Sequence, residues 1–160
     1  MWLEALTDVV LLSFTFAVYP GLIMEGAVQF TSSVSWSSLV MIACFNVSDT
    51  VGRFLAPCAL TCNSDLMTIL AYVRFPLLGT STCMLAFKVF RMDILRIVNV
   101  LFVGFSNGFF CTLLVIYGPA KCAPHEKAKA GQLMGMSIVS GIFLGTLIAF
   151  AGVSRISFPE

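Results

Sequence analysis

The stretch Phe45-Asn46-Val47-Ser48-Asp49-Thr50-Val51-Gly52-Arg53 decides how the rest of the chain is interpreted. It lies in an apolar run from about residue 38 to residue 62, and Asp49 and Arg53 are the only charged residues of that run. Because these two are four residues apart, they share one face of a helix, and Asn46 lies on the same face. Ionisable side chains deep in a membrane usually face the protein interior or a wet cavity. This face is therefore a candidate solute site.

The composition of the whole chain predicts an integral membrane protein. Hydrophobic residues make up 59% of the 160 residues and charged residues only 11%, whereas about a quarter of the residues of soluble domains are charged. The mean hydropathy of +0.98 agrees with this prediction. The net charge of +1 gives no basic footprint for nucleic acid, so no nucleic-acid partner is expected.

A membrane-spanning helix needs about 20 predominantly apolar residues. Five segments of the chain meet this requirement, at about residues 9–28, 38–62, 66–87, 97–117 and 126–153. We therefore predict an all-α membrane protein that forms a single bundle of five transmembrane helices. No soluble domain and no cofactor are expected.

Polar residues in the other segments have simpler interpretations. Arg74 lies about two turns from the start of its helix, so its long side chain is expected to extend to the membrane surface. Asp49 is then the only carboxylate expected deep in the bilayer. Asn107 follows the pattern of a residue that makes a hydrogen bond between two helices.

Small residues recur in the last segment and predict a packing surface. Gly131, Gly135, Gly141 and Gly145 fall within about a third of the helix circumference at 100° per residue. Such a strip lets a second helix approach backbone to backbone.

Four motifs together resemble the equilibrative nucleoside transporter family. Phe45-Asn46-x-x-Asp49-x-x-Gly52-Arg53 resembles the signature of that family's eighth transmembrane helix. The other three motifs, in the same order and spacing as in the family, are Tyr19-Pro20 of its seventh helix, Phe105-Ser106-Asn107-Gly108 with Tyr117-Gly118-Pro119 of its tenth helix and following loop, and Ala130-Gly131 of its eleventh helix.

The resemblance implies a fold related to the major facilitator superfamily, with eleven helices arranged as six plus five. The chain would then be the C-terminal bundle of five, with its N-terminus cytoplasmic and the six-helix half absent. Asp49 and Arg53 would be the acid and base of the substrate cavity, with Asn46 beside them. Ile42 and Ile142 would line that cavity with apolar side chains. The plasma membrane is the expected location.

Two classes of function remain open. The first is a facilitator that moves nucleosides, with nucleobases as a further solute class, by alternating access with a separate N-terminal half. The second is a non-transporting membrane subunit that pairs with a full-length transporter. From the residues alone, a solute site and a structural ion pair explain Asp49 and Arg53 equally well, and the resemblance favours the solute site. An enzyme is not predicted, because the sequence has no pair of deep aspartates, no Ser/His pair and no metal cluster.

Overall fold

A computed structural model describes residues 1–25, 34–60, 64–86 and 93–155 of the chain. These residues form five α-helices and a short 3₁₀-helix: α1 (Trp2–Glu25), α2 (Val34–Leu55), η1 (Ala56–Ala59), α3 (Ser64–Ala86), α4 (Asp93–Ala120) and α5 (Lys127–Arg155). The prediction of an all-α protein with five helices is confirmed. The side chains of Tyr19 and Pro20, which carry one of the four motifs, lie outside the described part of the structure.

Two helix boundaries differ from those expected from hydropathy. Helix α1 begins at Trp2 rather than near residue 9, because the acidic Glu4 and Asp8 are buried inside the bundle instead of preceding the span in solution. Helix α2 ends at Leu55, and the chain continues as η1, which has a proline in its first turn. Proline lacks an amide hydrogen and ends the regular hydrogen-bond pattern at this point.

The surface of the bundle suits a lipid environment. Within the described residues, three segments are long and apolar enough to cross a membrane: Trp36–Ala59, Ile94–Ala120 and Lys127–Ala151. Large apolar side chains cover their outer faces, and Phe54 and Phe150 are 79% and 76% exposed. Exposed apolar surface on this scale marks contact with a membrane or with another protein.

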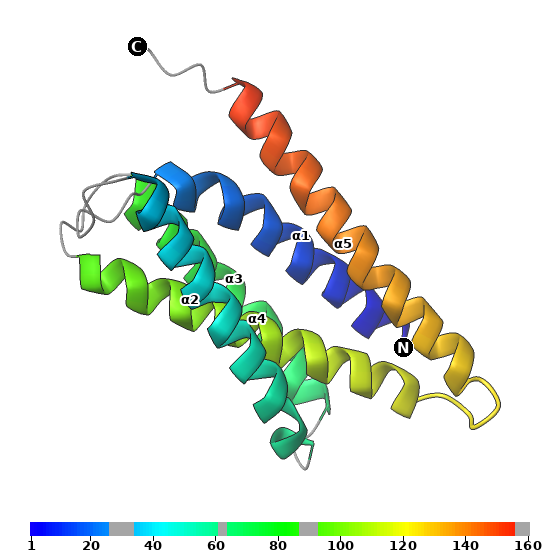
Figure 1. Cartoon of the computed structure of the whole chain (residues 1–160). Coiled ribbons are helices and arrows are strands. Elements are labelled where there is room, and N and C mark those ends of the chain that lie inside the picture. The colour runs from blue at the N-terminus through cyan, green and yellow to red at the C-terminus, as the bar shows by residue number, and fades with distance from the viewer. Residues whose placement is uncertain (26–33, 61–63, 87–92, 156–160) are drawn as a thin grey trace.

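The helices are arranged as two closely packed pairs (Figure 1). Helix α2 crosses α4, and α1 lies alongside α5. Contacts between α1 and α4 join the two pairs, and α3 packs on both of these helices. Helices α2 and α5 do not pack against each other in the described part of the chain. The face of α2 that carries Asp49 and Arg53 is therefore not covered by α5 of the same chain.

Glycines allow the backbones of α2 and α4 to touch. A Cβ atom added to Gly52 would lie 2.9 Å from the amide nitrogen of Phe109, and one added to Gly104 would lie 2.7 Å from the carbonyl oxygen of Phe45. A Cβ on Gly108 would collide with the carbonyl group of Asp49. Any larger residue at these positions would force the helices apart, as at other small-residue helix crossings in membranes.

The second pair uses half of the glycine strip predicted from the sequence. Cβ atoms added to Gly141 and Gly145 would lie 3.0 Å from the carbonyl oxygen of Val9 and 2.6 Å from that of Ser13, so both glycines face α1. Gly131 and Gly135 have no atom within 4 Å of such a Cβ. The strip thus divides into a part packed on α1 and a part that stays open.

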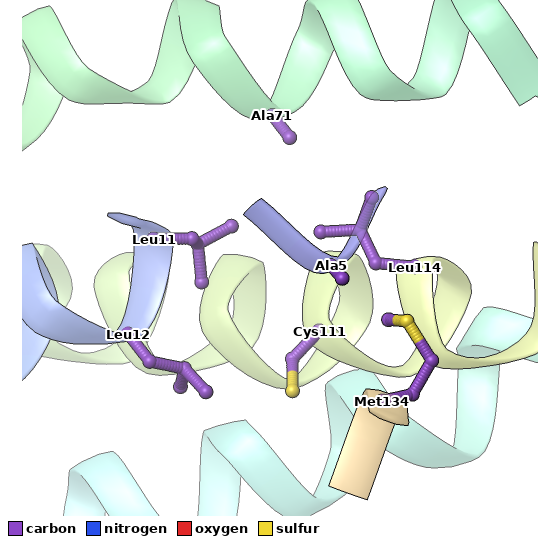
Figure 2. Close-up of a cluster of buried hydrophobic side chains, with 7 residues drawn as sticks. All are labelled: Ala5, Leu11, Leu12, Ala71, Cys111, Leu114 and Met134. Atoms are coloured by element: carbon purple, nitrogen blue, oxygen red, sulfur yellow. The ribbon is translucent and has the colours of Figure 1, made fainter. Parts of the chain in front are cut away.

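The main apolar core lies where the two pairs meet (Figure 2). It contains side chains from four helices: Ala5, Leu11 and Leu12 of α1, Ala71 of α3, Cys111 and Leu114 of α4, and Met134 of α5. Small residues on α1, α3 and α4 let the larger leucines fill the space between the helices. The core therefore fixes how α1, which carries buried polar groups, sits against α4.

An ionic cluster closes one end of the bundle. Lys121, in the turn between α4 and α5, contacts Glu4 Oε1 at 2.5 Å and Asp65 Oδ1 at 3.1 Å. The hydrogen bond to Glu4 raises the pKa of Lys121 above its ordinary value. The cluster ties the first turns of α1 and α3 to the turn between α4 and α5.

Replacing Gly108 by alanine is expected to destabilise the bundle by about 1–3 kcal/mol, the usual cost of forcing extra volume into a tight contact. The added methyl group would push α4 away from the backbone of Asp49. Thermal or denaturant unfolding of the purified chain in detergent measures this change.

Gly135→Ala is the matched control, because nothing lies near this glycine. Alanine favours a helix interior over glycine by about 0.5–1 kcal/mol, so this variant should unfold at the same or a slightly higher temperature. Equal destabilisation by the two substitutions would show that the α2–α4 contact is not a close backbone approach.

Candidate functional site

The polar side chains of the bundle interior gather halfway along the helices. Asn107 is the central residue of the span Ile94–Ala120, and Asp49 lies close to the centre of Trp36–Ala59. Arg74 lies near the middle of α3 (Ser64–Ala86). These three residues from three helices form a connected polar layer at the level where the middle of a bilayer is expected.

Asp49 and Arg53 form an ion pair within α2. The Nε of Arg53 lies 2.7 Å from Oδ2 of Asp49. The two side chains differ in exposure, since Arg53 is 49% exposed and Asp49 only 14%. The carboxylate is thus held inside the bundle while part of the guanidinium remains open to its surroundings.

Asn107 connects this pair to α4. Its amide nitrogen Nδ2 donates a hydrogen bond of 2.9 Å to Oδ1 of Asp49, and its side chain is 2% exposed. The bond depends on the glycine beside it, because Gly108 lets the backbone of Asp49 come within reach. Asn107 therefore makes the contact between helices that its sequence context suggested, and its partner is the Asp49 carboxylate.

Arg74 does not extend to the membrane surface, and that prediction is wrong. Its side chain is 2% exposed. Its guanidinium donates to the carbonyl oxygen of Val103 at 3.1 Å, to Thr15 Oγ1 at 3.3 Å and to Asn107 Oδ1 at 3.4 Å. Helices α1 and α4 supply acceptors for both terminal nitrogens of Arg74 at this depth, so the side chain does not need to reach water, although its Nε has no partner among the described residues.

The remaining candidate residues of α2 lie in line with the ion pair. At about 100° per residue, the side chains of Ile42, Asn46, Asp49 and Arg53 fall within about 60° of the helix circumference. Ile42 is 37% exposed and Asn46 is also exposed. The buried side of α2, with Met41, Phe45, Ser48 and Gly52, adjoins this stripe. The exposed apolar residues Val47 and Val51 are on a different part of the helix.

Ile142 is not joined to this stripe within the chain. It is partly buried on α5, next to the contact that Gly141 makes with α1. Since α2 and α5 do not pack together, nothing in the described part of the chain brings Ile42 and Ile142 into one pocket.

Besides Glu4, α1 carries another buried carboxylate, Asp8, which faces α4 and α5. Asp8 is completely buried and accepts a hydrogen bond of 2.9 Å from Ser137 Oγ through Oδ2. Its other oxygen, Oδ1, has no hydrogen-bond partner among the described residues. The sequence had suggested that Asp49 is the only deep carboxylate, and the burial of Asp8 shows that this prediction is wrong. Within the same residues, no group of three His, Cys, Asp or Glu side chains could hold a metal ion.

Comparison with known proteins tests the likeness carried by the helix motifs. The profile of the family described as Nucleoside transporter matches residues 2–153. This chain belongs to the nucleoside transporter family. Its match to the family covers all five helices, including the α2 stripe and the polar layer, and no solved structure matches the chain.

Several curated members of the nucleoside transporter family are similar to the chain. Equilibrative nucleoside transporter 4 of Danio rerio is 29% identical over 157 residues, which cover 96% of this chain and 30% of that protein. The human protein of the same name is 27% identical, with 96% and 29% covered. Equilibrative nucleoside transporter 2 of Rattus norvegicus is 29% identical, with 94% and 36% covered. The chain thus spans about a third of the length of these relatives.

Replacing Asn107 by alanine is expected to destabilise the bundle by about 1–3 kcal/mol, because it leaves buried hydrogen-bonding groups of Asp49 and Arg74 unpaired. Asn46→Ala removes the same amide from the exposed stripe and should change stability by less than about 0.5 kcal/mol. Unfolding of both variants in detergent measures the difference. Equal stability of the two variants would contradict the assignment of Asn107 to the centre of the polar layer.

Proposed function

We propose that the chain is one helical bundle of a facilitative transporter and that the α2 stripe is its part of the solute site. The observation that carries this proposal is the Asp49–Arg53 pair at mid-helix. A pair that served only to pack helices would be enclosed on all sides, whereas the Arg53 side chain is half exposed. Its exposed part lies on the same side of α2 as Asn46 and Ile42, away from the exposed apolar residues Val47 and Val51.

The chemistry of this stripe suits a nucleoside. Such a solute is neutral, carries hydroxyl groups on its sugar and has a flat, apolar base. An ionised Asp49 offers acceptors for ribose hydroxyls, Arg53 offers a planar set of donors, and Asn46 offers both. Ile42 supplies apolar contact for the base. The charges of the pair cancel, so the site does not impose a net charge on an uncharged solute.

The solute site needs a second bundle to be complete. Helix α4 covers only the Asp49 part of the α2 stripe, so Asn46 and half of the Arg53 side chain stay exposed. Helix α5, which carries Ile142, does not pack on α2. In transporters that work by alternating access, the binding site lies at the midplane between two bundles that rock about it. We propose that an N-terminal bundle covers the stripe and brings Ile142 to the same cavity. The plasma membrane is the location that we propose.

Co-expression of the chain with an N-terminal six-helix half of a nucleoside transporter should restore uptake of labelled adenosine or uridine. Asp49→Asn and Arg53→Gln should each abolish that uptake, because each removes one partner of the pair while keeping a side chain of similar size. Uptake of radiolabelled nucleoside by cells, corrected for surface expression, is the measurement.

Lys127→Gln provides the control for loss of charge, since this lysine is exposed in the first turn of α5, far from the α2 stripe along the chain. It should leave uptake unchanged. Uptake that is restored but indifferent to both Asp49→Asn and Arg53→Gln would remove the site from α2. Failure of every N-terminal half to restore uptake would argue against transport by this chain.

The open part of the glycine strip supports a second candidate function. An open groove of about 430 Å³ runs along the outer side of α5 and is lined by Gln132, Gly135, Met136, Val139 and Ser140. Small residues at an open helix face suit close packing of another transmembrane helix. The chain would then act as a non-transporting subunit that binds a full-length transporter through α5.

Gly135→Leu separates the two candidates. A leucine would protrude into the groove and block close approach of a second helix. If the chain acts as a subunit, Gly135→Leu should abolish its co-purification with the full-length transporter, and nucleoside should not change the thermal stability of the native chain. Co-purification that survives Gly135→Leu would eliminate this role for the groove.

A further inference from the structure

Arg74 is a buried charge that the Asp49–Arg53 pair does not explain. Its side chain is 2% exposed, and the described residues place no carboxylate within salt-bridge distance of it. A charged group halfway through a bundle is costly, and helix packing alone is served as well or better by an apolar residue of similar size. The contacts of Arg74 therefore need a reason beyond packing.

The hydrogen bonds around Arg74 run in a single direction. The hydroxyl of Thr15 donates to the carbonyl oxygen of Leu11 at 2.8 Å, which leaves its lone pairs free to accept from Arg74. Arg74 in turn donates to Oδ1 of Asn107. Asn107 then donates through Nδ2 to Oδ1 of Asp49 at 2.9 Å. Thr15 and Asn107 thus offer acceptors to Arg74, and Asn107 donates to the Asp49 carboxylate.

Arg74 and Asp49 together fix which way the Asn107 amide points. An arginine has only donors, so it can bind the oxygen of an amide but not its NH₂ group. With the oxygen held on the side of α3, the NH₂ group must face α2, where Asp49 lies. A flipped amide would turn its oxygen toward the carboxylate and would repel it. A neutral residue at position 74 would leave Asp49 alone to hold this orientation, without a cation on the amide oxygen.

We propose that Arg74 is a positioning residue of the solute site, which fixes the Asn107 amide and through it the orientation of the Asp49 carboxylate. The inference rests on the proposed function of Asp49. Held in this way, each carboxylate oxygen keeps a free lone pair for a solute hydroxyl, because Oδ1 is occupied by Asn107 and Oδ2 by Arg53 through single bonds. Recognition of sugar hydroxyls therefore depends on Arg74, although Arg74 itself is buried behind Asn107.

Transport kinetics test the functional part of this proposal. In the chain co-expressed with an N-terminal half, Arg74→Gln should raise the KM for uridine by about tenfold, the effect of losing one hydrogen bond to a charged group. The KM for 2′,3′-dideoxyuridine should not change, because this analogue lacks the ribose hydroxyls at C2′ and C3′. The maximal rate per transporter at the surface should be retained.

A spectroscopic signature tests the same contact without transport. The carboxylate stretching band of Asp49, identified in ¹³C-aspartate-labelled chain by subtracting the spectrum of Asp49→Asn, should shift in Arg74→Gln because the hydrogen bond from Asn107 weakens when its amide oxygen loses the cation. Lys127→Gln should leave the band in place. Should Arg74→Gln fail to fold, Arg74→Lys replaces it: one ammonium cannot reach Asn107, Val103 and Thr15 together, so a smaller shift in the same direction is expected.

The two readouts separate failure of this proposal from failure of the proposed function. An Asp49 band that is unchanged by both Arg74 variants overturns the positioning role, whatever the uptake shows. A parallel loss of uridine and dideoxyuridine transport, together with a lower unfolding temperature, also overturns it, because Arg74 would then only hold helices together. If the band shifts but no N-terminal half restores uptake, the positioning role is kept and the proposed transporter function is rejected.

Discussion

The backbone contact between α2 and α4 is the constraint on which the rest of the structure depends. Gly52 and Gly108 have no side chains, so the two helix backbones can approach each other at these positions. Only at this separation can Asn107 reach the Asp49 carboxylate at 2.9 Å. The orientation of the Asp49–Arg53 pair thus depends first on helix packing, because an ion pair on an isolated α2 would have no fixed orientation relative to the other helices.

The charges of the bundle interior follow from this packing. Asp49 has a direct partner in Arg53 and an indirect one in Arg74, which acts across Asn107. In a medium of low polarity such groups persist only when hydrogen bonds satisfy them, and here α1, α3 and α4 all contribute. The most exposed of these side chains is Arg53, which is 49% exposed at the edge of the α2–α4 contact. The arrangement fits a bundle whose binding surface is completed by a second one.

Much of this arrangement was accessible from the sequence, and what was missed has physical reasons. Hydropathy predicted five helices, and the spacing of Asp49 and Arg53 predicted their pairing, because both properties are local. Arg74 was misplaced because its depth depends on whether neighbouring helices supply acceptors, and Thr15 and Val103 are distant in sequence. The burial of Asp8 depends in the same way on Ser137. The spacing Gly104-x-x-x-Gly108 could have predicted the α2–α4 contact. It overlaps the motif Phe105-Ser106-Asn107-Gly108, in which only Asn107 had been interpreted.

The central claim is that the Asp49 side of α2 looks onto a wet space rather than onto lipid. Reaction of introduced cysteines with a water-soluble, membrane-impermeant thiol reagent tests it most directly, in the chain co-expressed with an N-terminal half and with its native cysteines replaced by serine or alanine. Asn46→Cys should react and should be protected by uridine, whereas Val47→Cys, 63% exposed on the apolar side in the native chain, should not react. Equal reaction at both positions, or reaction at Val47→Cys alone, would contradict the account.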